Sequence, residues 1–568
     1  PPKLNVLSLQ ESKGLSVDEL ATHLAPFKVQ RATITALVDS FEHAKTFGSL
    51  IQIPYAFKTH LAVLPEVLTL VKQSGDMYAT AAADDLLPLV QQAQVLAMQF
   101  DAVVANPPYM GGRNGMNDAL KSFSEANFPS GKADIYAAFI DRGMIALRPG
   151  HGSLAFITME GWMFLPSFEE LRKKIQNGSS IATLLHLGPR AFETISGEIV
   201  RVVAFTVTQK SLAGDGVIDC FRLVKPKTET EKRDAFLSET SSIKFVQKNF
   251  SRIPEGRMAY WLSPAVIACF DKGRNIESIA PVRQGFQTGN NDKFMRFWYE
   301  ISQSKTMLEA SCKEDVFASG RKWVPYNKGG EFRKWFGNND YVVAFDKKNY
   351  ETLAVSGNCL PSRNFYFQPG ITWSAMGGTF GARVSPKGFT FSAKGASAFP
   401  SAVDSPLVLS LLNSKVADAM FEFLAPTLDF NVGAIRLIPI PDLSTDSIAE
   451  IGKRVQALIT IAESEWDSSE TSWNFKCPEL VGDRLASARL AWGALQDRRC
   501  AEIRQADQLT SEVDSFLIAA YGLGEESSLA GAKSDFAYLA PVEATQTEKL
   551  ISYAIGCMMG RYSLDEPG

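Results

Sequence analysis

The sequence predicts an α/β protein that starts with part of a Rossmann-like sheet. Three observations support this prediction. Strands and helices alternate in residues 1–225, short strands with many glycines and aromatics fill residues 276–445, and residues 446–568 are mainly helical. Strand-helix-strand alternation indicates a parallel, doubly wound sheet with right-handed crossovers. We therefore expect a sheet domain, an irregular α+β domain and a helical C-terminal region, with a connector at 226–275.

In the first part, apolar runs predict strands and periodic stretches predict helices. The expected strands are LNVLSL (4–9), DAVVA (101–105), GSLAFITM (152–159), IATLLHL (181–187), EIVRVVAFTVTQ (198–209) and VIDCFRLV (217–224). The last of these can pair with the strand before it. Helices are expected in an insertion at 15–98, at 133–150 and at 168–178, where glycines mark the ends of the last two.

After residue 225 the pattern changes. The charged stretch KPKTETEKRDAF (225–236) predicts a solvated connection. Short strands and turn dipeptides then continue to IPIPDL (438–443), which is typical of an irregular α+β domain. Beyond it, IAEIGKRVQALITIAESEW (448–466) and ADQLTSEVDSFLIAAYGL (506–523) predict long amphipathic helices.

The composition argues against several classes of protein. Of the 568 residues 45% are hydrophobic and 21% are charged, and no apolar run approaches the roughly 20 residues that span a membrane. No signal peptide is visible. The seven cysteines form no CxxC pair and the five histidines are dispersed. We therefore expect a cytoplasmic protein with reduced thiols, no metal and no membrane partner.

The charge is divided unevenly along the chain, whose formal net charge is -4. Residues 276–441 carry 18 Lys and Arg against 14 Asp and Glu, whereas residues 446–568 carry 11 against 20. A mildly basic middle is compatible with DNA held in a local cleft.

The strand DAVVA runs directly into Asn-Pro-Pro-Tyr, and we take Asn106, Pro107, Pro108 and Tyr109 as the candidate catalytic residues. Proline ends the strand abruptly, at the carboxyl edge where open α/β sheets bind ligands. The Asn106 amide and the Pro107 carbonyl offer two acceptors, which match an exocyclic NH₂ group with two hydrogens. Two such hydrogen bonds direct the lone pair of the amine nitrogen toward an electrophile. The Tyr109 ring can stack on a flipped base.

At these residues the chain resembles the amino-methyltransferases that use S-adenosylmethionine, in which Asn-Pro-Pro-Tyr/Phe ends the fourth strand. Asn in first position is usual there for adenine N6 methylation. ADIYAAFIDRGMIALRPGHGSLAFITMEGWMFL resembles the segments that follow the motif, which implies that Asp134 and Phe139 lie beside the cofactor. RAFETISGEIVRVVAFTV resembles a later motif whose aromatic, here Phe192, packs against the flipped base. Plain core packing remains an equal alternative for Phe139 and Phe192.

The resemblance extends over most of the chain. Segments at 283–294, 370–385, 409–441 and 516–523 look like the PglX family, large adenine-specific DNA methyltransferases of the BREX phage-defence systems. A class I methyltransferase sheet followed by a target-recognition domain, here 276–445, is also the order of the gamma group. The resemblance implies transfer of a methyl group from S-adenosylmethionine to one adenine in a short site of double-stranded DNA. It also implies other defence-system proteins as partners.

One part of the family pattern is absent from the sequence. The glycine-rich cofactor loop after the family's first strand is not found, nor is the acidic residue that ends its second strand. LNVLSL matches the third strand and places Asn5 where relatives often have Asp near the cofactor adenine. We therefore expect the chain to start inside the catalytic domain and to supply only part of the cofactor site, from Asn5, Asn106, Asp134 and Phe139.

The expected recognition domain contains polar side chains that suit base edges. Arginine pairs with guanine and Asn or Gln with adenine, although more such residues contact phosphates or stabilise turns. The candidate DNA-binding residues are Arg283, Gln287, Thr288, Asn290, Asn291, Lys293, Arg363 and Arg383.

Two other functions stay open. The chain can be the modification part of a fused restriction-modification enzyme, although no nuclease motif of the PD-(D/E)xK type is evident in it. It can also be a DNA-recognition and scaffold module of a defence complex that does not itself methylate. Protein-glutamine methyltransferases share Asn-Pro-Pro-Tyr, but they are small and lack a domain like 276–441.

Overall fold

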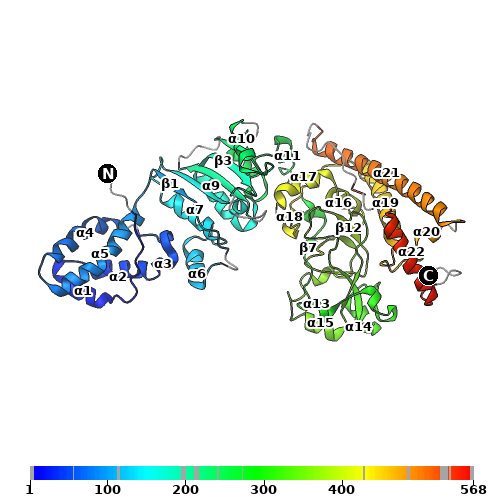
Figure 1. Ribbon diagram of the computed structural model, residues 1–568, viewed down its shortest axis with the longest axis horizontal. Coiled ribbons are helices and arrows are strands. Elements are labelled where there is room, and N and C mark those ends of the chain that lie inside the picture. The colour runs from blue at the N-terminus through cyan, green and yellow to red at the C-terminus, as the bar shows by residue number, and fades with distance from the viewer. Residues whose placement is uncertain are drawn as a thin grey trace. The chain divides into compact units, whose positions relative to one another are not determined.

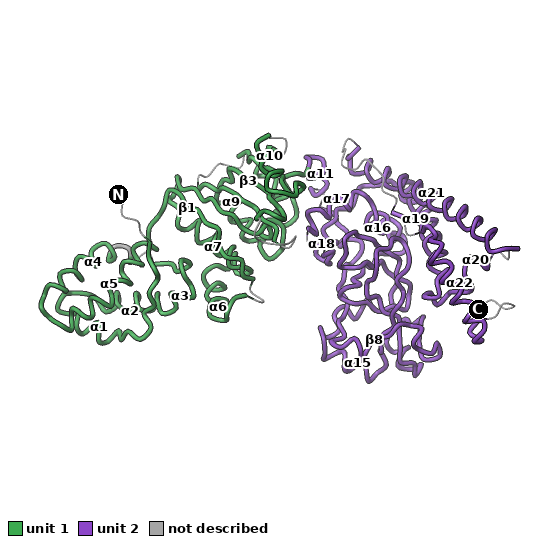
Figure 2. The backbone as a smooth tube through the Cα atoms, in the orientation of Figure 1, with its two compact units in different colours: residues 1–262 green, residues 263–568 purple. Residues whose placement is uncertain are grey.

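The structure, a computed structural model, describes residues 6–562 except 55–56, 112–114, 193–199, 210–215, 239–241, 272, 427–428, 483–485, 525–534 and 537–538. Its contacts divide the chain into two units, Pro1–Leu262 and Ser263–Gly568 (Figure 2). Over the described residues, no helix has the length and apolar character needed to cross a membrane. The same residues contain no group of three or more His, Cys, Asp or Glu side chains placed to hold a metal ion.

The first unit begins with a bundle of helices, drawn in blue in Figure 1. The helices are α1 Val17–Leu24, α2 Arg31–Phe41, α3 Ala44–Phe47, α4 Lys58–Lys72 and α5 Met77–Ala97. Ser16 caps α1 and Asp76 caps α5, each by accepting backbone N–H groups of the first turn. Apolar side chains from α1, α2, α4 and α5 share one core. Helices therefore lie in the range 15–98, where a helical insertion was expected.

The sheet of the first unit has six strands in the order β1-β2-β4-β3-β5-β6. The strands are β1 Ala102–Ala105, β2 Ser153–Met159, β3 Ser180–Gly188, β4 Val202–Thr208, β5 Val217–Arg222 and β6 Ser242–Val246. Strands β1 and β2 are parallel, and so are β3 and β5. Strand β4 runs antiparallel to both of its neighbours, and β6 runs antiparallel to β5. The sheet is therefore mixed, and the expectation of a fully parallel sheet is wrong.

Helices connect the parallel strands, as the alternating pattern predicts. Helices α6 Asp118–Asn127 and α7 Ile135–Ile145 lie between β1 and β2 in the chain, and α8 Gly161–Phe164 and α9 Glu169–Gly178 lie between β2 and β3. The buried Arg142 on α7 donates to the carbonyls of Ser49 and Leu96 at 3.1 and 2.8 Å, which ties the helical bundle to the sheet region. Because β1, β2 and β3 point the same way, their carboxyl ends share one edge with the start of β4.

Three strand expectations need correction. Residues 6–9 form no strand, because no neighbouring strand is there to complete a ladder, and Asn5 lies outside the described residues. Strand β5 pairs with β3 and not with β4, since β2 and β3 already occupy both edges of β4. Residues 226–262 are not a solvated connector, because α10 Glu229–Leu237 and β6 extend the first unit and β6 bonds to β5.

The second unit contains two four-stranded sheets, in the orders β13-β9-β10-β8 and β12-β11-β14-β7. The strands are β7 Val282–Arg283, β8 Met295–Phe297, β9 Trp323–Asn327, β10 Tyr341–Ala344, β11 Gly370–Trp373, β12 Ala382–Ser385, β13 Thr390–Phe391 and β14 Ser397–Ala398. An aromatic core that includes Phe286, Tyr326, Phe345 and Phe391 packs around the first sheet. Short strands with an aromatic core agree with the α+β character expected for 276–445.

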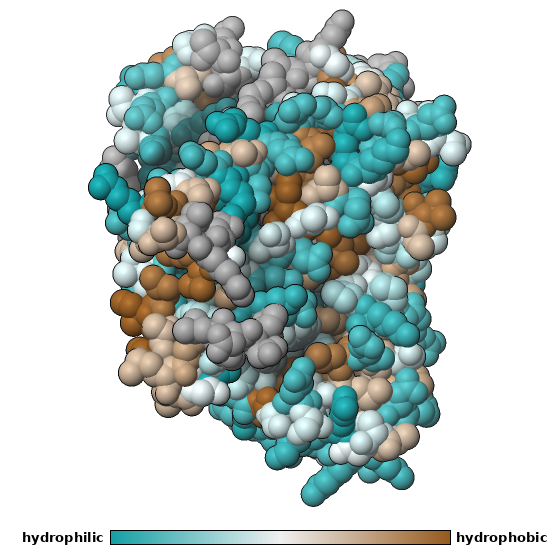
Figure 3. All heavy atoms as spheres, turned by 90° about the vertical axis from the view of Figure 1, so that its right-hand side faces the viewer, coloured by the Kyte–Doolittle hydropathy of each residue, from teal (hydrophilic) through white to brown (hydrophobic). Residues whose placement is uncertain are grey.

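Helices surround and follow these sheets. They are α11 Pro264–Ala268, α12 Ile276–Ile279, α13 Asn291–Phe294, α14 Lys313–Ser319, α15 Lys347–Leu353, α16 Ser405–Leu412, α17 Lys415–Leu424, α18 Val432–Arg436, α19 Thr445–Asp467, α20 Glu479–Gly482, α21 Ala488–Tyr521 and α22 Glu543–Met558. The two long helices expected near 448–466 and 506–523 are α19 and α21. On the face seen in Figure 3, hydrophilic side chains predominate and hydrophobic patches lie between them, as amphipathic helices predict.

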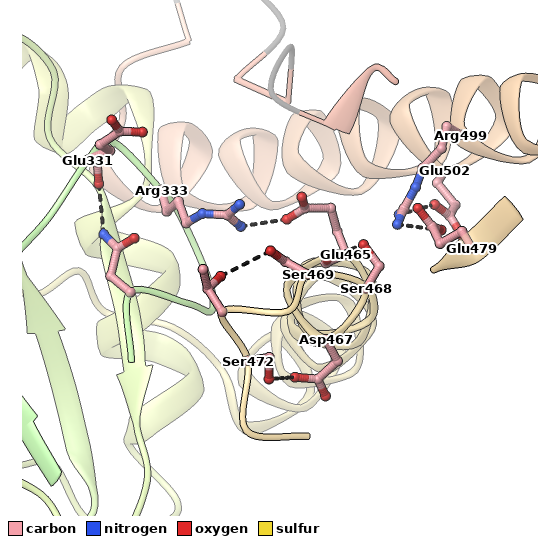
Figure 4. A network of polar contacts seen from close by, with 12 residues as sticks. Glu331, Arg333, Glu465, Asp467, Ser468, Ser469, Ser472, Glu479, Arg499 and Glu502 are labelled. Carbon is pink, nitrogen blue, oxygen red and sulfur yellow. Dashed lines mark hydrogen bonds and ion pairs between the residues drawn. The ribbon is translucent and has the colours of Figure 1, made fainter. Parts of the chain in front are cut away.

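Ion pairs join the sheets of the second unit to its C-terminal helices (Figure 4). Arg333 donates to Glu465 on α19 at 2.5 Å, and its guanidinium lies 4.9 Å from the centre of the Trp466 ring. Farther along, the buried Arg499 of α21 pairs with Glu479 and Glu502 at 2.7 and 2.6 Å. The helical region thus packs against the sheets within one compact unit.

Candidate active site

The Asn106 corner, residues 106–109, follows β1 at the carboxyl edge of the sheet. Asn106 is exposed, Pro107 is buried and Tyr109 is half-buried. The Tyr109 hydroxyl donates to Asn106 Oδ1 at 3.2 Å. Burial raises the pKa of Tyr109, so this phenol stays protonated and remains a donor at neutral pH. The amide oxygen of Asn106 is therefore presented as a hydrogen-bond acceptor at the open end of the strand.

Asp134 fixes the segment that leaves the corner. Its Oδ1 accepts the backbone N–H of Met110 at 3.0 Å and that of Tyr136 at 3.4 Å, and so caps α7. The Ile135 N–H donates in return to the Met110 carbonyl at 3.0 Å. Burial raises the pKa of Asp134, although the Met110 and Tyr136 N–H groups act in the opposite direction. The residue expected beside the cofactor thus also holds the corner against α7.

Tyr136 is a neighbour of the corner that sequence reasoning missed. Its buried ring stands edge-on to the Tyr109 ring, with centroids 6.0 Å apart and planes at 88°. On its other side it packs against Phe168 at 5.8 Å. Burial, and then the Asp134 charge, raise the pKa of Tyr136 well above its ordinary value. The Tyr109 ring is thus supported by a fixed aromatic partner.

The two aromatic residues expected around the base and cofactor have different surroundings. Phe139 is half-buried and packs against a core that includes Leu120, Phe128 and Ile135, so core packing accounts for at least part of its side chain. Phe192 is half-buried in the segment after β3. The residues that follow it, 193–199, lie outside the described residues.

A buried polar cluster lies at the same edge of the sheet, and the sequence analysis did not identify it. Glu160, directly after β2, contacts His186 Nε2 on β3 at 2.8 Å and pairs with Arg201 at the start of β4. Burial acts to raise the pKa of Glu160, but His186 and Arg201 outweigh it and lower that pKa. The signal available in the sequence was a lone glutamate directly after a buried strand.

Three of the residues expected beside the cofactor, Asn106, Asp134 and Phe139, lie directly after β1, at the N-cap of α7 and on α7. Strand β1 pairs only with β2 in the described part of the chain, and Val104 on it is 77% exposed. In the described part of the chain, β1 is therefore not covered on the face that carries Val104. The donor and acceptor set of Asn106 and Asp134, with the ring of Phe139, fits one side of a nucleoside-containing cofactor such as S-adenosylmethionine.

The candidate DNA-binding residues fall into two groups. Gln287, Thr288 and Asn291 line one pocket, where Thr288 Oγ1 donates to Asn291 Oδ1 at 2.7 Å. Asn290 caps α13 by accepting the Lys293 N–H at 3.0 Å, a structural use of its side chain. Lys293 itself is exposed.

The side chains of the three candidate arginines either form contacts within the protein or are buried in it. Arg283 pairs with Glu277 at 2.6 Å, and Arg363 donates to the Leu360 carbonyl at 3.0 Å. Arg383 lies on β12 and is only 2% exposed, so in this structure its guanidinium cannot reach a DNA groove. We therefore withdraw Arg383 from the proposed DNA-binding residues.

The sheet with Asn-Pro-Pro-Tyr at the carboxyl end of a strand has counterparts among known proteins. Residues 26–192 match the family model of the Eco57I restriction-modification methylase. The matched range includes the helical bundle, the Asn106 corner and Phe192. Residues 26–192 of the chain are thus similar to restriction-modification methylases.

The chain is also similar to two adenine-specific methyltransferases. It is 33% identical to BrxX of Escherichia coli O9:H4 (strain HS), with 100% of this chain and 49% of BrxX covered. It is also 33% identical to PglX of Lacticaseibacillus casei (strain Zhang), with 85% of this chain and 41% of PglX covered. The expected resemblance to the PglX family is thereby confirmed, and the chain spans about half the length of these relatives or less.

Two solved structures of restriction-modification enzymes resemble the chain more distantly. MmeI in complex with DNA is 12% identical with a TM-score of 0.43, over 96% of this chain and 77% of MmeI. LlaGI with a DNA substrate mimic is 13% identical with a TM-score of 0.41, over 81% of this chain and 44% of LlaGI. At such scores neither structure carries an argument for this chain.

Proposed function

We propose that the protein is a site-specific DNA adenine-N6 methyltransferase of a phage-defence system, with S-adenosylmethionine as methyl donor. The observation that carries this proposal is the Asn106 amide oxygen, presented with Tyr109 at the carboxyl edge of the sheet in a chain 33% identical to adenine-specific methyltransferases. The relatives are named for adenine, and two acceptors at residues 106 and 107 suit the exocyclic amine of that base.

The residues of the corner have separate tasks in this proposal. Asn106 Oδ1 and the Pro107 carbonyl accept the two hydrogens of the adenine amine and so direct its lone pair outward. Tyr109 stacks on the flipped base, and Tyr136 keeps the Tyr109 ring in place. In the present structure the Tyr109 hydroxyl donates to Asn106 Oδ1, the position that the adenine amine would take. The cofactor, when bound, supplies the methyl group.

Binding of DNA is assigned to the second unit in this proposal. In base-flipping enzymes, contacts elsewhere on the duplex offset the free-energy cost of unstacking the target base, and most of those contacts are to phosphates. Residues 276–441 have a net positive charge, with 18 Lys and Arg against 14 Asp and Glu, and hold the pocket lined by Gln287, Thr288 and Asn291. We propose Gln287 and Asn291, with Lys293, Arg283 and Arg363, as the DNA-facing set, whereas Thr288 is only 2% exposed and orients Asn291. Other defence-system proteins complete the assembly.

The test is to express the full-length protein in a host without adenine methylation and to map modified adenines across the genome. The proposal predicts N6-methyladenine at one short motif, and none with the Asn106→Ala variant. Both proteins are also tested for binding to the motif. An unmodified genome, together with tight binding of the wild-type protein to one sequence, would reject the proposal in favour of a recognition and scaffold module.

A further inference from the structure

A small polar pocket of about 270 Å³ lies on the second unit, where three distant segments of the chain meet. Its walls are Gln287, Thr288, Gly289, Asn291, Lys328, Ser392, Ala393 and Lys394. The expected recognition residues supply only one side of it. The loop after β9 contributes Lys328, and the segment after β13 contributes Ser392 and Lys394, none of which the sequence analysis singled out.

The described residues that line the pocket include two lysines and no carboxylate. Lys328 is half-buried, and its ammonium is 3.4 Å from Asn291 Oδ1. Among the described residues, no carboxylate forms an ion pair with Lys328 or with the exposed Lys394. Burial lowers the pKa of Lys328. A desolvated cation with a free side is a binding site for an anion.

The backbone holds the walls of the pocket in fixed positions. The Gln287 N–H donates to Asn358 Oδ1 at 2.7 Å, and Gly357 approaches the Gln287 carbonyl so closely that a Cβ there would lie 1.9 Å from its oxygen. On the other wall, the Ser392 N–H donates to the Asn327 carbonyl at 2.9 Å, and Ser392 Oγ accepts the Lys394 N–H at 3.1 Å. The site is therefore formed before any ligand arrives, which lowers the entropic cost of binding.

We propose that this Lys328 pocket binds a phosphodiester group of the DNA backbone, with Lys328 and Lys394 as the two cations. The inference rests on the proposed function for its ligand, since that function supplies the DNA. Two lysines without a carboxylate match the single negative charge of a phosphodiester and leave a positive excess that strengthens its capture. The pocket is smaller than usual cofactor sites of about 300–1,000 Å³, which suits one phosphate group.

The polar groups around the two lysines support the same assignment. Asn291 Oδ1 is already engaged by Thr288 and Lys328, so the amide turns its NH₂ group away from them as a further donor. Gln287 is exposed at the rim and can donate in the same way. The pocket thus offers cations and neutral donors together, which is what phosphate oxygens accept and what a base edge alone does not require.

The experiment measures DNA binding by fluorescence anisotropy over a range of salt concentrations. The proteins are the wild type, Lys328→Gln, Lys394→Gln and, as matched control, Lys348→Gln, an exposed lysine on α15 that does not line the pocket. Each pocket variant is expected to weaken binding roughly threefold to tenfold and to reduce the slope of log K against log[salt] by about one. The control is expected to retain the slope of the wild type. Melting curves verify that all four proteins are folded.

The sequence of the DNA decides what the pocket contacts. A phosphate contact weakens all duplexes alike, whereas a base contact weakens only duplexes with the recognised motif. A loss confined to one motif overturns the phosphate assignment, and so does an unchanged salt slope in folded variants of both lysines. The binding assay does not depend on methylation. A wild-type protein that binds DNA without methylating it would therefore refute the proposed function and still leave the pocket test decisive.

Discussion

The Asn106 corner and the Lys328 pocket keep their polar groups in place in opposite ways. The corner is four consecutive residues at the open end of an edge strand, supported by Asp134 and Tyr136. The pocket is formed by segments 287–291, 328 and 392–394. Its backbone is held by a contact between Gly357 and the Gln287 carbonyl that leaves no room for a side chain at residue 357. A reacting group must meet an entering base and cofactor, so it stays accessible. A group that grips the DNA backbone gains from being rigid.

This difference predicts which measurement responds to each region. Changes at the corner should alter the rate of methyl transfer and leave DNA affinity intact. Changes at the pocket should alter affinity and its salt dependence and leave the rate at saturating DNA intact.

Asn106→Ala should have the largest effect. Loss of one of two acceptors that position the amine should lower the rate of methyl transfer by about 10²–10³, by analogy with the removal of one positioned hydrogen-bonding group elsewhere. Single-turnover methyl transfer at saturating DNA measures the rate, and anisotropy measures the affinity. The affinity should stay within about twofold, because phosphate contacts dominate it. A rate close to wild type would exclude Asn106 as the catalytic residue.

Tyr109 should show a smaller and separable effect. Tyr109→Ala removes the stacking surface and should cost about 1–3 kcal/mol in binding of the flipped base, measured as a rise in KM for DNA. Tyr109→Phe keeps the ring and loses only the hydrogen bond to Asn106 Oδ1. It should therefore stay near the wild type. Equal losses in the two variants would show that the hydroxyl, and not the ring, is what matters.

Asp134→Ala should combine a stability effect with a rate effect. Loss of an N-cap typically costs about 1 kcal/mol in the free energy of unfolding. Ser16 caps α1 in the same way and lies outside the corner, so Ser16→Ala is the matched control. Both variants should melt earlier, but only Asp134→Ala should also slow methyl transfer, since Asp134 holds Met110. Equal rates in both variants would reduce Asp134 to a structural cap.

Asp514 on α21 is a buried acidic residue that belongs to neither the Asn106 corner nor the Lys328 pocket. It therefore gives a prediction about stability alone. Burial raises the pKa of Asp514, against the Lys415 N–H and the charges of Lys334 and Lys415. The protonated form is favoured on folding, so this contribution to stability is present at acid pH and is lost as pH rises through the folded-state pKa.

Asp514→Asn should therefore stabilise the protein at neutral pH by the order of 1 kcal/mol, a shift in Tm of a few degrees. The difference in Tm between variant and wild type should grow as pH rises from acid to neutral. Methyl transfer and DNA affinity should not change. A difference that shrinks with rising pH would mean that the neighbouring lysines outweigh burial.

The corner could be predicted from the sequence because its geometry comes from adjacent residues. Proline fixes the end of β1, and the N-cap at Asp134 follows a local pattern. The helices of the bundle and α19 and α21 were likewise predicted, since their periodicity is long and regular. Tyr136 lies in the first turn of α7, but its contact with Tyr109 depends on how α7 packs.

What could not be predicted depends on pairing between distant segments. The sequence of β5 is apolar enough to pair with β4, but in the structure β5 pairs with β3. No local feature of the sequence identifies β3 as that partner. Arg383 is of a residue type that often contacts bases, but residues on both faces of its short strand are largely buried. The pattern of polar and apolar residues therefore did not indicate that Arg383 is buried. Lys328 and Lys394 are ordinary lysines in the sequence. Only the fold brings them beside Asn291.

The most direct test of the central claim is to find which atom of DNA receives the methyl group. The purified full-length protein is incubated with duplex DNA and S-adenosylmethionine carrying a deuterated methyl group, and the digested nucleosides are analysed by mass spectrometry. The account predicts label in N6-methyladenine alone, and none when Asn106 is replaced by alanine. Label in a methylated cytosine, or in adenine with the Asn106→Ala protein at the wild-type level, would contradict it.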